Sequence, residues 1–389
     1  MTAEHPPDEG ARPALTASSP TVAQAPERKI SPRRKLAIAF VVVVALGLVA
    51  AGRFDIPYYA LSPGSIRETE PLIQLGAGTP DPDAGSISFA TVAVEGRLNL
   101  LQALSGWWDP TIDVVDEDLI LGGRTQQQSD EVNQVLMNDS KELAIQLALT
   151  KLDLAEPAGA AVTGALQPGG PGDGDGAAAL SAGDVIVSVD AVPVHSAVEV
   201  LRAVDGLAVG AEVVLEIERA VADERGAIHT AGVDRPEPTV ERAVLVDHDG
   251  RAALPYQLRD AYRTSYTGEV DIDSGQVGGP SAGLAFTLGI IDELTEGDLT
   301  GGFKVAATGT IDLQGEVGPI GGIQQKATAA SRAGVELFLV PDSLPPSELA
   351  AAKELGKGVE LVEVGSLDEA LDALAAHRGN EAALPALRA

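Results

Sequence analysis

Residues 271–294 read DIDSGQVGGPSAGLAFTLGIIDEL, a polar, Gly-rich loop that runs into a strongly apolar segment. Pro280 suits the first position of a helix because its φ is already helical, and the apolar run Leu284–Leu294 predicts a buried helix. Ser281 is then expected at a helix amino terminus, where free N–H groups and the positive end of the dipole can hold a developing oxyanion. The candidate oxyanion backbone belongs to the neighbours of this serine: Gly279, Pro280 and Ala282.

Two other interpretations of Ser281 stay open at this point. A Gly–Pro turn whose serine caps the helix needs no chemistry. The segment Gly279–Gly283 also matches the G-x-S-x-G elbow of α/β hydrolases, which would make the chain an esterase. That elbow needs a strand-to-helix turn with Asp and then His following, whereas here a Gly-rich loop precedes the serine and only His377 follows it.

A second element lies downstream, where residues 307–322 predict strand, turn and strand and then a Gly-Gly break into a helix, Ile323–Ala333. Lys326 shares the apolar face of that helix, so we expect it to be buried. Burial lowers the pKa of an ammonium from about 10.4 towards neutrality, and a neutral lysine can take a proton from a serine. The sequence therefore predicts a Ser281–Lys326 dyad that needs no histidine. The alternative is a lysine with its head in water.

The pattern GGPSAG followed by ATGTI-x5-VGPIGGI-x2-K-x2-A resembles the proteolytic domain of the Lon (S16) peptidases, from about Gly250 to His377. The resemblance implies that Ser281 is the nucleophile of a serine endopeptidase, Lys326 its general base and Thr308 a hydroxyl that orients the lysine. The separation of 326 − 281 = 45 residues suits the family.

The chain departs from the family pattern in two places. Many Lon enzymes have an Asp just before Gly-Pro-Ser, where this chain has Gly278, so the role of that acid is absent or falls to Asp273. No GxxxxGK[ST] loop occurs in these 389 residues, so we expect ATP-independent hydrolysis of flexible or membrane-tethered protein substrates and no cofactor.

The amino-terminal part contains an uncharged apolar run, Leu36–Gly52, directly after five basic residues. Length and flanking charge predict a single-pass membrane helix with a cytoplasmic amino terminus and an extracytoplasmic catalytic domain. The competing interpretation is a signal peptide cleaved after the small residues Val49–Ala51. The basic residues are Arg28, Lys29, Arg33, Arg34 and Lys35.

Between these parts, Leu180–Asp190 and Gly210–Arg219 resemble the turn-and-strand and the closing strand of PDZ domains. The resemblance implies capture of an extended peptide by strand addition. A Gly-rich insertion, Gly169–Gly176, departs from the pattern, and a small sandwich without a ligand is the alternative. The positions that match the peptide-binding strand are Gly159, Ala160, Ala161 and Val162.

Composition excludes several other functions. The chain has no cysteine, which excludes disulfides and thiol catalysis, and its five histidines lack metal-ligand spacing. A net charge of −30 argues against nucleic acid as a partner. The acidic run Asp113–Asp118 lacks the EF-hand pattern and is expected to be a solvated loop.

Together these features predict an α+β fold, with a Lon-type proteolytic domain, a PDZ β-sandwich and one transmembrane helix. The whole arrangement resembles the secreted PDZ-Lon proteases of Gram-positive bacteria and actinobacteria, and a catalytically silent PDZ scaffold is the remaining rival. The expected parts are a disordered tail 1–35, an anchor 36–52, a membrane-proximal α/β region 53–156, a PDZ-like domain 157–246, a proteolytic domain 250–378 and a disordered tail 379–389.

Overall fold

The computed structural model divides the chain into two compact units, Met1–Phe54 and Asp55–Ala389. The predicted tail residues 1–30 and 379–389 lie outside the described residues, as does the Gly-rich insertion. The structure describes residues 31–75, 85–166, 180–219, 221–222, 228–229, 237–266, 270–295 and 298–377.

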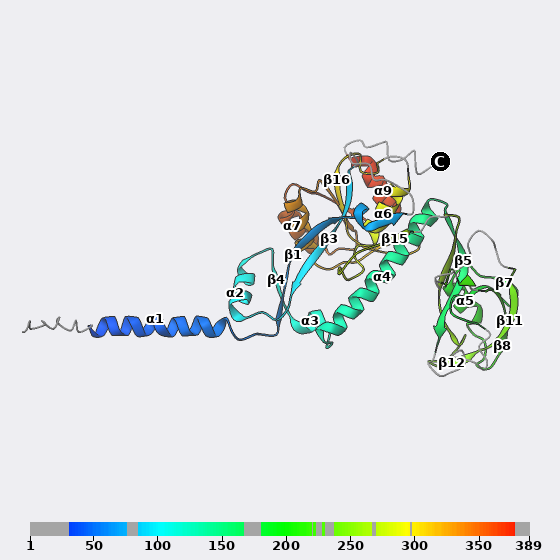
Figure 1. The fold of residues 1–389 in the computed structure, drawn as a ribbon, viewed down its shortest axis with the longest axis horizontal. Coiled ribbons are helices and arrows are strands. Elements are labelled where there is room, and N and C mark those ends of the chain that lie inside the picture. The colour runs from blue at the N-terminus through cyan, green and yellow to red at the C-terminus, as the bar shows by residue number, and fades with distance from the viewer. Residues whose placement is uncertain are drawn as a thin grey trace, which may run out of the picture. The chain divides into compact units, whose positions relative to one another are not determined.

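The described part of the first unit is dominated by one helix, α1 (Pro32–Ala51) (Figure 1). It begins four residues before the predicted span because Ser31 caps it, accepting a hydrogen bond from Arg34 N, and Pro32 takes the first position. None of its residues is buried, and by length and composition alone it could cross a membrane. At about 1.5 Å per residue, its 20 residues are roughly as long as the hydrocarbon core is thick.

The second unit is built on a mixed sheet with the strand order β20-β19-β16-β3-β1-β4. β20, β19, β16 and β3 run parallel, and β1 pairs antiparallel with both β3 and β4. The predicted membrane-proximal region 53–156 is thus not a separate part, because it supplies three strands of this sheet. The strands are β1 (Tyr58–Glu68), β3 (Ser86–Glu95), β4 (Asp113–Asp116), β16 (Lys304–Ala307), β19 (Leu337–Pro341) and β20 (Glu360–Val364).

Helices cover both faces of this sheet, and the alternation of strand side chains shows which core each residue joins. Val305 and Leu339 belong to a core with α4, α6 and α9, whereas their neighbours Ala306 and Phe338 belong to a core with α7 and α8. The helices are α4 (Gln126–Lys151), α6 (Gly283–Leu294), α7 (Ile323–Ala333), α8 (Pro346–Leu355) and α9 (Leu367–Ala376). The shorter ones are α2 (Leu100–Trp108), α3 (Glu117–Leu121) and the 3-10 turn η1 (Glu70–Leu72).

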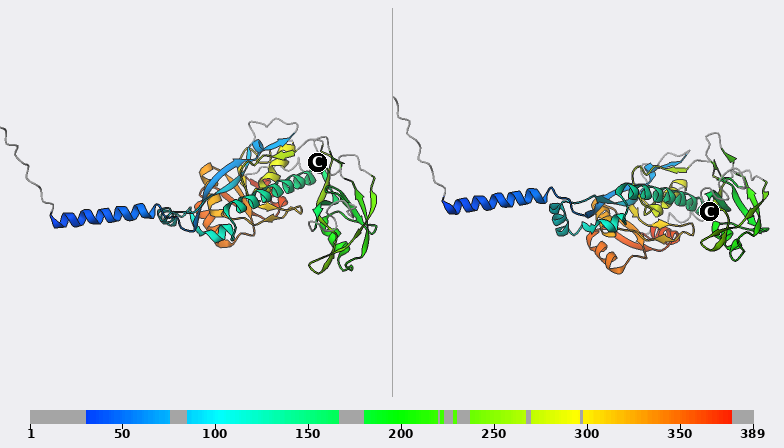
Figure 2. Two further views of the ribbon diagram at one scale, coloured as in Figure 1. Left: turned by 60° about the horizontal axis from the view of Figure 1, so that its bottom comes forward. Right: turned by 90° about the horizontal axis from the view of Figure 1, so that it is seen from below.

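A second sheet, in the order β11-β8-β6-β5-β14 with β7 beside β6, is inserted between α4 and β15 and is seen in green in Figure 2. It is one sheet whose core includes Val200 and Val204 of α5, rather than the expected pair of facing sheets. It also extends past the predicted end at residue 246, because β14 is one of its strands. Its elements are β5 (Ala155–Ala165), β6 (Val185–Val189), β7 (Val192–Pro193), α5 (Ala197–Val204), β8 (Glu212–Glu218), β11 (Thr239–Val244) and β14 (Tyr256–Thr264).

The remaining strands form short antiparallel pairs. β15 pairs with β2 and leads into the loop that carries Ser281, and β17 and β18 form the turn that precedes α7. The pairs are β2 (Ile73–Leu75) with β15 (Val270–Ile272), β17 (Thr310–Ile311) with β18 (Val317–Gly318), β12 (Val246–His248) with β13 (Arg251–Ala253), and β9 (Val221–Ala222) with β10 (Ile228–His229).

Candidate active site

Ser281 lies in the loop between β15 and α6, two residues before the helix begins. Ala282 is the N-cap and Gly283 the first helical residue, so Pro280 precedes the helix and does not open it as the sequence predicted. Gly279 has φ +89°, a conformation that a side chain rarely permits. A Cβ at Gly278 would lie 2.9 Å from Asn133 Cβ, which explains why this chain has no room for an acid there.

The Lys326 side chain reaches this serine from the second turn of α7. Its Nζ lies 2.9 Å from Ser281 Oγ and 2.9 Å from Thr308 Oγ1. The residue is only 3% exposed, and it lies on the buried face as its spacing predicted. Burial lowers the pKa of Lys326 to about 7, because the charged form loses its hydration. Near neutral pH a large fraction of this amine is therefore free to accept a proton.

Thr308 fixes both members of the pair. Its Oγ1 donates to the backbone oxygen of Ser281 at 3.1 Å, so the same hydroxyl accepts from the lysine. The neighbouring Gly309 N donates to that Ser281 oxygen at 2.9 Å, and Thr308 N donates to Leu339 O at 3.0 Å. The serine and the lysine are thus both tied to the end of β16.

Helix α4 holds the serine loop from the other side. Gly279 N donates to Asn133 O at 2.8 Å, and Ser140 Oγ donates to Pro280 O at 3.0 Å. Sequence reasoning missed these residues. Their signal was the i, i+4, i+7 spacing of Asn133, Met137 and Ser140 on one helix face, but nothing local shows what that face contacts.

The three candidate oxyanion positions differ in what their backbones can donate. Pro280 has no N–H and Gly279 N is already bonded to Asn133 O, so neither can serve as the sequence suggested. The N–H groups of Ser281 and Ala282 have no hydrogen-bond partner among the described residues. These two adjacent donors, beside Ser281 Oγ, are the ones left to bind an oxyanion.

A cavity of about 480 Å³ opens over the pair, and both Ser281 and Lys326 line it. Its wall is largely apolar, with Arg67, Asn133 and Gln276 as the long polar side chains. Such a cavity can hold a peptide side chain next to the nucleophile. The apolar lining side chains are Leu61, Phe89, Ala90, Val92, Val94, Met137, Val277 and Ala282.

The residues that alternative mechanisms would need lie elsewhere. His377 does not line the cavity, and its Nδ1 faces Glu360 Oε2 at 3.2 Å while its ring meets Phe303 edge-on. The esterase elbow therefore lacks its histidine. Asp273 is exposed and accepts a hydrogen bond from Gly275 N at 3.0 Å, so it does not replace the acid of the Lon pattern.

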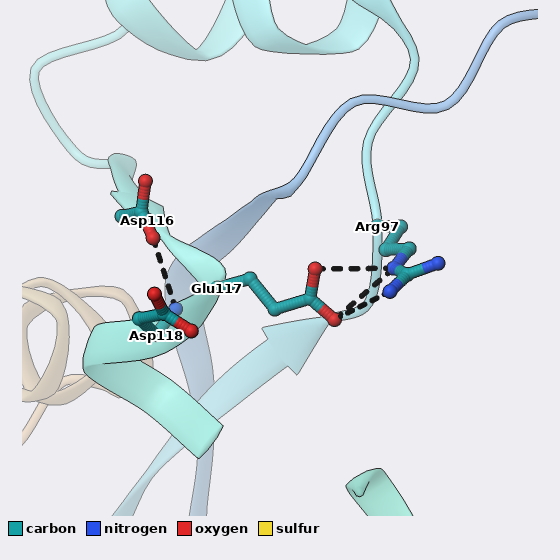
Figure 3. Close-up of polar contacts among 4 residues, drawn as sticks. All are labelled: Arg97, Asp116, Glu117 and Asp118. Carbon is teal, nitrogen blue, oxygen red and sulfur yellow. Dashed lines mark hydrogen bonds and ion pairs between the residues drawn. The ribbon is translucent and has the colours of Figure 1, made fainter. Parts of the chain in front are cut away.

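The acidic run Asp113–Asp118 has structural partners and is not a loop. Asp116 caps α3 by accepting from Asp118 N at 3.0 Å, and Glu117 forms a two-pronged ion pair with Arg97 (Figure 3). Asp113 Oδ2 accepts from Gln325 Nε2 at 2.9 Å. Within the described ranges, no group of His, Asp and Glu side chains is arranged to hold a metal ion.

The predicted peptide-binding segment, Gly159–Val162, is an interior strand segment. β5 pairs with β14 on one edge and with β6 on the other, and Ala160 and Ala161 have registered partners on both sides. Strand addition at these residues is therefore blocked, and the prediction is wrong about them. Among the described strands, β14 and β11 end the sheet and leave one edge each unpaired.

Comparison with known proteins identifies the catalytic part. Residues 255–376 match the family model of the Lon protease (S16) C-terminal proteolytic domain. A Lon protease of Roseiflexus castenholzii is 40% identical over 93 residues, which cover 24% of this chain and 11% of that protein. A Lon protease of Mycoplasma mobile is 35% identical over 96 residues, covering 25% and 11%.

A longer alignment, with a Lon protease of Halothermothrix orenii, is 29% identical over 169 residues and covers 41% of this chain and 20% of that protein. The alignments thus span about a fifth or less of the length of these relatives. These alignments leave about four fifths or more of each relative's length uncovered. The chain therefore carries a Lon-type (S16) proteolytic domain, a domain of the serine endopeptidase class.

Proposed function

We propose that the chain is a membrane-anchored serine endopeptidase that uses a Ser281–Lys326 dyad and needs no ATP. The neutral Lys326 amine takes the proton from Ser281 Oγ as this oxygen attacks the scissile carbonyl. The tetrahedral oxyanion is held by the N–H groups of Ser281 and Ala282. Lys326 then gives the proton to the leaving amine as the C–N bond breaks, and water hydrolyses the acyl-enzyme with the same base.

One observation carries this proposal: the buried Lys326 Nζ lies 2.9 Å from Ser281 Oγ, with a pKa of about 7. A lysine amine in water has a pKa of about 10.4, so it would be protonated at neutral pH and could not act as a base. Thr308 supports the same role, because its hydroxyl lies 2.9 Å from Nζ and keeps the lysine turned towards the serine.

Helix α1 supports the proposed place of action, and the absence of a GxxxxGK[ST] loop from these 389 residues supports the proposed kind of substrate. A single apolar helix after a basic segment supports anchoring with the catalytic domain outside the cytoplasm. Without a motor sequence in these 389 residues, substrates are protein segments that are already flexible or are held near the bilayer. Protein and peptide substrates are the partners proposed, and nucleic acid is not.

The second sheet supports an additional role in peptide capture, as its PDZ-like sequence predicts, but at a different strand. Among the described strands, none pairs with the outer edge of β14, and α5 lies beside this strand, with Ala197 N donating to Asp260 Oδ1 at 2.6 Å. An extended peptide can add to the β14 edge next to α5. A Leu258→Pro variant tests this assignment. Leu258 lies opposite Val162, whose N–H donates to Asp184 O on the β6 side, so the Leu258 N–H points away from β5 and its loss should weaken peptide binding in a fluorescence-anisotropy titration. Unchanged binding would contradict the assignment to this edge.

Casein cleavage by the full chain and its variants tests the dyad. Ser281→Ala and Lys326→Ala are expected to reduce cleavage to background, whereas the control Lys357→Ala removes an exposed lysine and leaves it unchanged. Lys326→Arg is also expected to be inactive, because a guanidinium does not deprotonate. If the Lys326→Ala variant still cleaves casein and this cleavage depends on His377, the esterase-type elbow is the correct interpretation. Full activity of both alanine variants would rule out the dyad.

The anchoring is tested separately, and the chain has no natural cysteine to interfere. A single cysteine at Asp271, which is exposed, should react with an impermeant maleimide applied to intact cells. A cysteine at Ser18 should react only after lysis. Labelling of both positions, or neither, in intact cells would contradict the proposed topology.

A further inference from the structure

Helix α2 (Leu100–Trp108) has an apolar face that the rest of the described structure does not cover. Its sequence, LLQALSGWW, contains no charged residue, and five of its nine residues are large apolar side chains that are 39 to 86% exposed. At about 100° per residue they fall within roughly a third of the helix circumference. We call them the apolar stripe of α2: Leu100, Leu101, Leu104, Trp107 and Trp108.

The packing of α2 on the protein uses another face of the helix. Ala103 and Gly106 are the buried residues, and a Cβ at Gly106 would lie 2.7 Å from Val114 Cγ2 of β4. The capping box of Asn99 and Gln102 fixes the start of the helix. The apolar stripe is therefore held in a defined position without contributing to the core, and an exposed apolar surface of this kind marks an interaction site.

The covalent chain determines which surface lies within reach of this stripe. Only six residues, Gly52–Pro57, separate the end of α1 from the start of β1 at Tyr58, and even fully extended they span no more than about 20 Å. Tyr58 is in turn in contact with α2, since its ring meets Trp107 edge-on at a centroid distance of 6.3 Å. If α1 crosses a bilayer, α2 is tethered close to that bilayer whatever the protein concentration.

We propose that the apolar stripe of α2 inserts into the interface of the lipid bilayer that α1 crosses, and so fixes the catalytic unit against the membrane. The proposal rests on the proposed membrane anchoring. Tryptophan favours the interface between water and hydrocarbon, and a helix with such a stripe lies in the plane of that interface. The exposed acids nearby in sequence, Asp55, Glu95 and Asp109, outnumber the exposed bases there, Arg53 and Arg97, so binding relies on apolar burial and does not need anionic lipids.

Contacts inside the protein connect α2 to the active site, so docking of α2 would also fix the position of the cavity. α2 packs against β4, and Asp113 of β4 accepts a hydrogen bond from Gln325, the residue next to Lys326 on α7. A membrane-docked α2 thus places the cavity at a defined height above the bilayer. This geometry selects substrate segments close to the membrane surface.

The chain offers a direct probe, because Trp107 and Trp108 are its only tryptophans. The full chain is reconstituted into phosphatidylcholine vesicles, and tryptophan emission is measured with acyl chains brominated close to the carbonyl and with iodide in the water. We expect the brominated lipid to quench about half of the emission or more, and iodide to quench it weakly, as for rings in the interface. Raising the salt concentration should leave both results unchanged.

Two variants and a flotation control make the result decisive. Leu101→Glu with Leu104→Glu should reduce quenching by the brominated lipid about twofold or more, because charge opposes insertion, whereas the exposed control Val240→Glu should not. Chain that floats with the vesicles but shows iodide quenching and no lipid quenching overturns the docking and leaves the anchoring intact.

Protection from both quenchers that disappears on dilution in lipid would assign the stripe to a second copy of the chain and also overturn the docking. Failure of the full chain to float would overturn the anchoring and, with it, the docking. The dyad is tested by a separate readout, casein cleavage measured on the same samples, so none of these outcomes decides whether the dyad is correct.

Discussion

In the proposed mechanism, the burial of Lys326 serves catalysis at the expense of stability. The side chain is 3% exposed, and its Nζ has only hydroxyl partners, Ser281 Oγ and Thr308 Oγ1, without a counter-ion within hydrogen-bond distance among the described residues. Two hydroxyls do not replace the hydration of an ammonium, so the neutral amine is favoured. The same environment that prepares the base therefore opposes the charged form at low pH.

The first prediction concerns the pH dependence of cleavage. The active base is the neutral amine, and the pKa of Lys326 is about 7, so kcat/KM for a short peptide should rise tenfold per pH unit below that value and level off above it. A fluorogenic peptide assayed from pH 5 to pH 10 checks this. A rate that still rises steeply above about pH 9 would assign the lysine a pKa near its value in water.

The second prediction is that Lys326→Met inactivates the protein and stabilises it. Between the folded pKa of about 7 and the unfolded value of 10.5, the unfolded chain binds more protons, so the wild-type contribution to stability from this group rises with pH. The gain from methionine should be on the order of 1–3 kcal/mol near pH 6 and shrink towards pH 10. Urea unfolding at both pH values measures it, with Lys357→Met as the exposed control; equal effects at both pH values would contradict it.

Helix α4 is the element whose role is least visible in the sequence. The sequence has helical spacing only from Asn138 to Leu152, whereas the capping box at Thr125 and Gln128 starts the helix twelve residues earlier, and its early turns carry Asn133 to the serine loop. The first half of this helix is polar, so no apolar repeat in the sequence indicates a helix there. A helix face that packs on a loop needs few apolar side chains.

The third prediction tests this clamp. Ser140→Ala removes the donor to Pro280 O, so the loop that carries Ser281 should be less well positioned, and kcat should fall about 3- to 30-fold with KM changing less. Ser129→Ala, near the start of the same helix, is the control. Steady-state kinetics on the fluorogenic peptide separates the two constants, and a change confined to KM would show that α4 contributes to binding and not to positioning.

Strong local signals made some elements predictable. α7 occurs at the predicted residues, since it has a clear apolar period and a closing glycine at position 334, and β8 lies within the predicted closing strand Gly210–Arg219. The burial of Lys326 was predictable for the same reason, because a lysine on an apolar helix face is a local feature. Strand order was not, since the pairing of Ile87 with Val305 joins segments that no local pattern relates.

Across the whole molecule, the chain passes between the main sheet and the second sheet through a single pair of strands. β5 enters the second sheet and β14 leaves it, and the register begins with Ala155 opposite Thr264. The chain therefore departs from the catalytic unit and returns to it at neighbouring positions, which is the geometry of an inserted module. The hydrophobic cores of the two parts also have no residues in common. A contact between the parts outside the strand pair is the Arg259–Glu142 ion pair, which joins β14 to α4.

The fourth prediction is that this module can be removed without destroying the dyad. Replacing residues 155–264 by a Gly-Ser linker joins two positions that are already cross-strand neighbours, so the main sheet and the contacts of Lys326 should remain. Cleavage of a short peptide should stay within about threefold of the parent, while cleavage of long unfolded proteins falls at least tenfold if the β14 edge captures them. Circular dichroism confirms folding of the variant. Loss of peptide cleavage in a variant that still unfolds cooperatively would show that the second sheet belongs to the active site, and equal loss on both substrates would remove its role in capture.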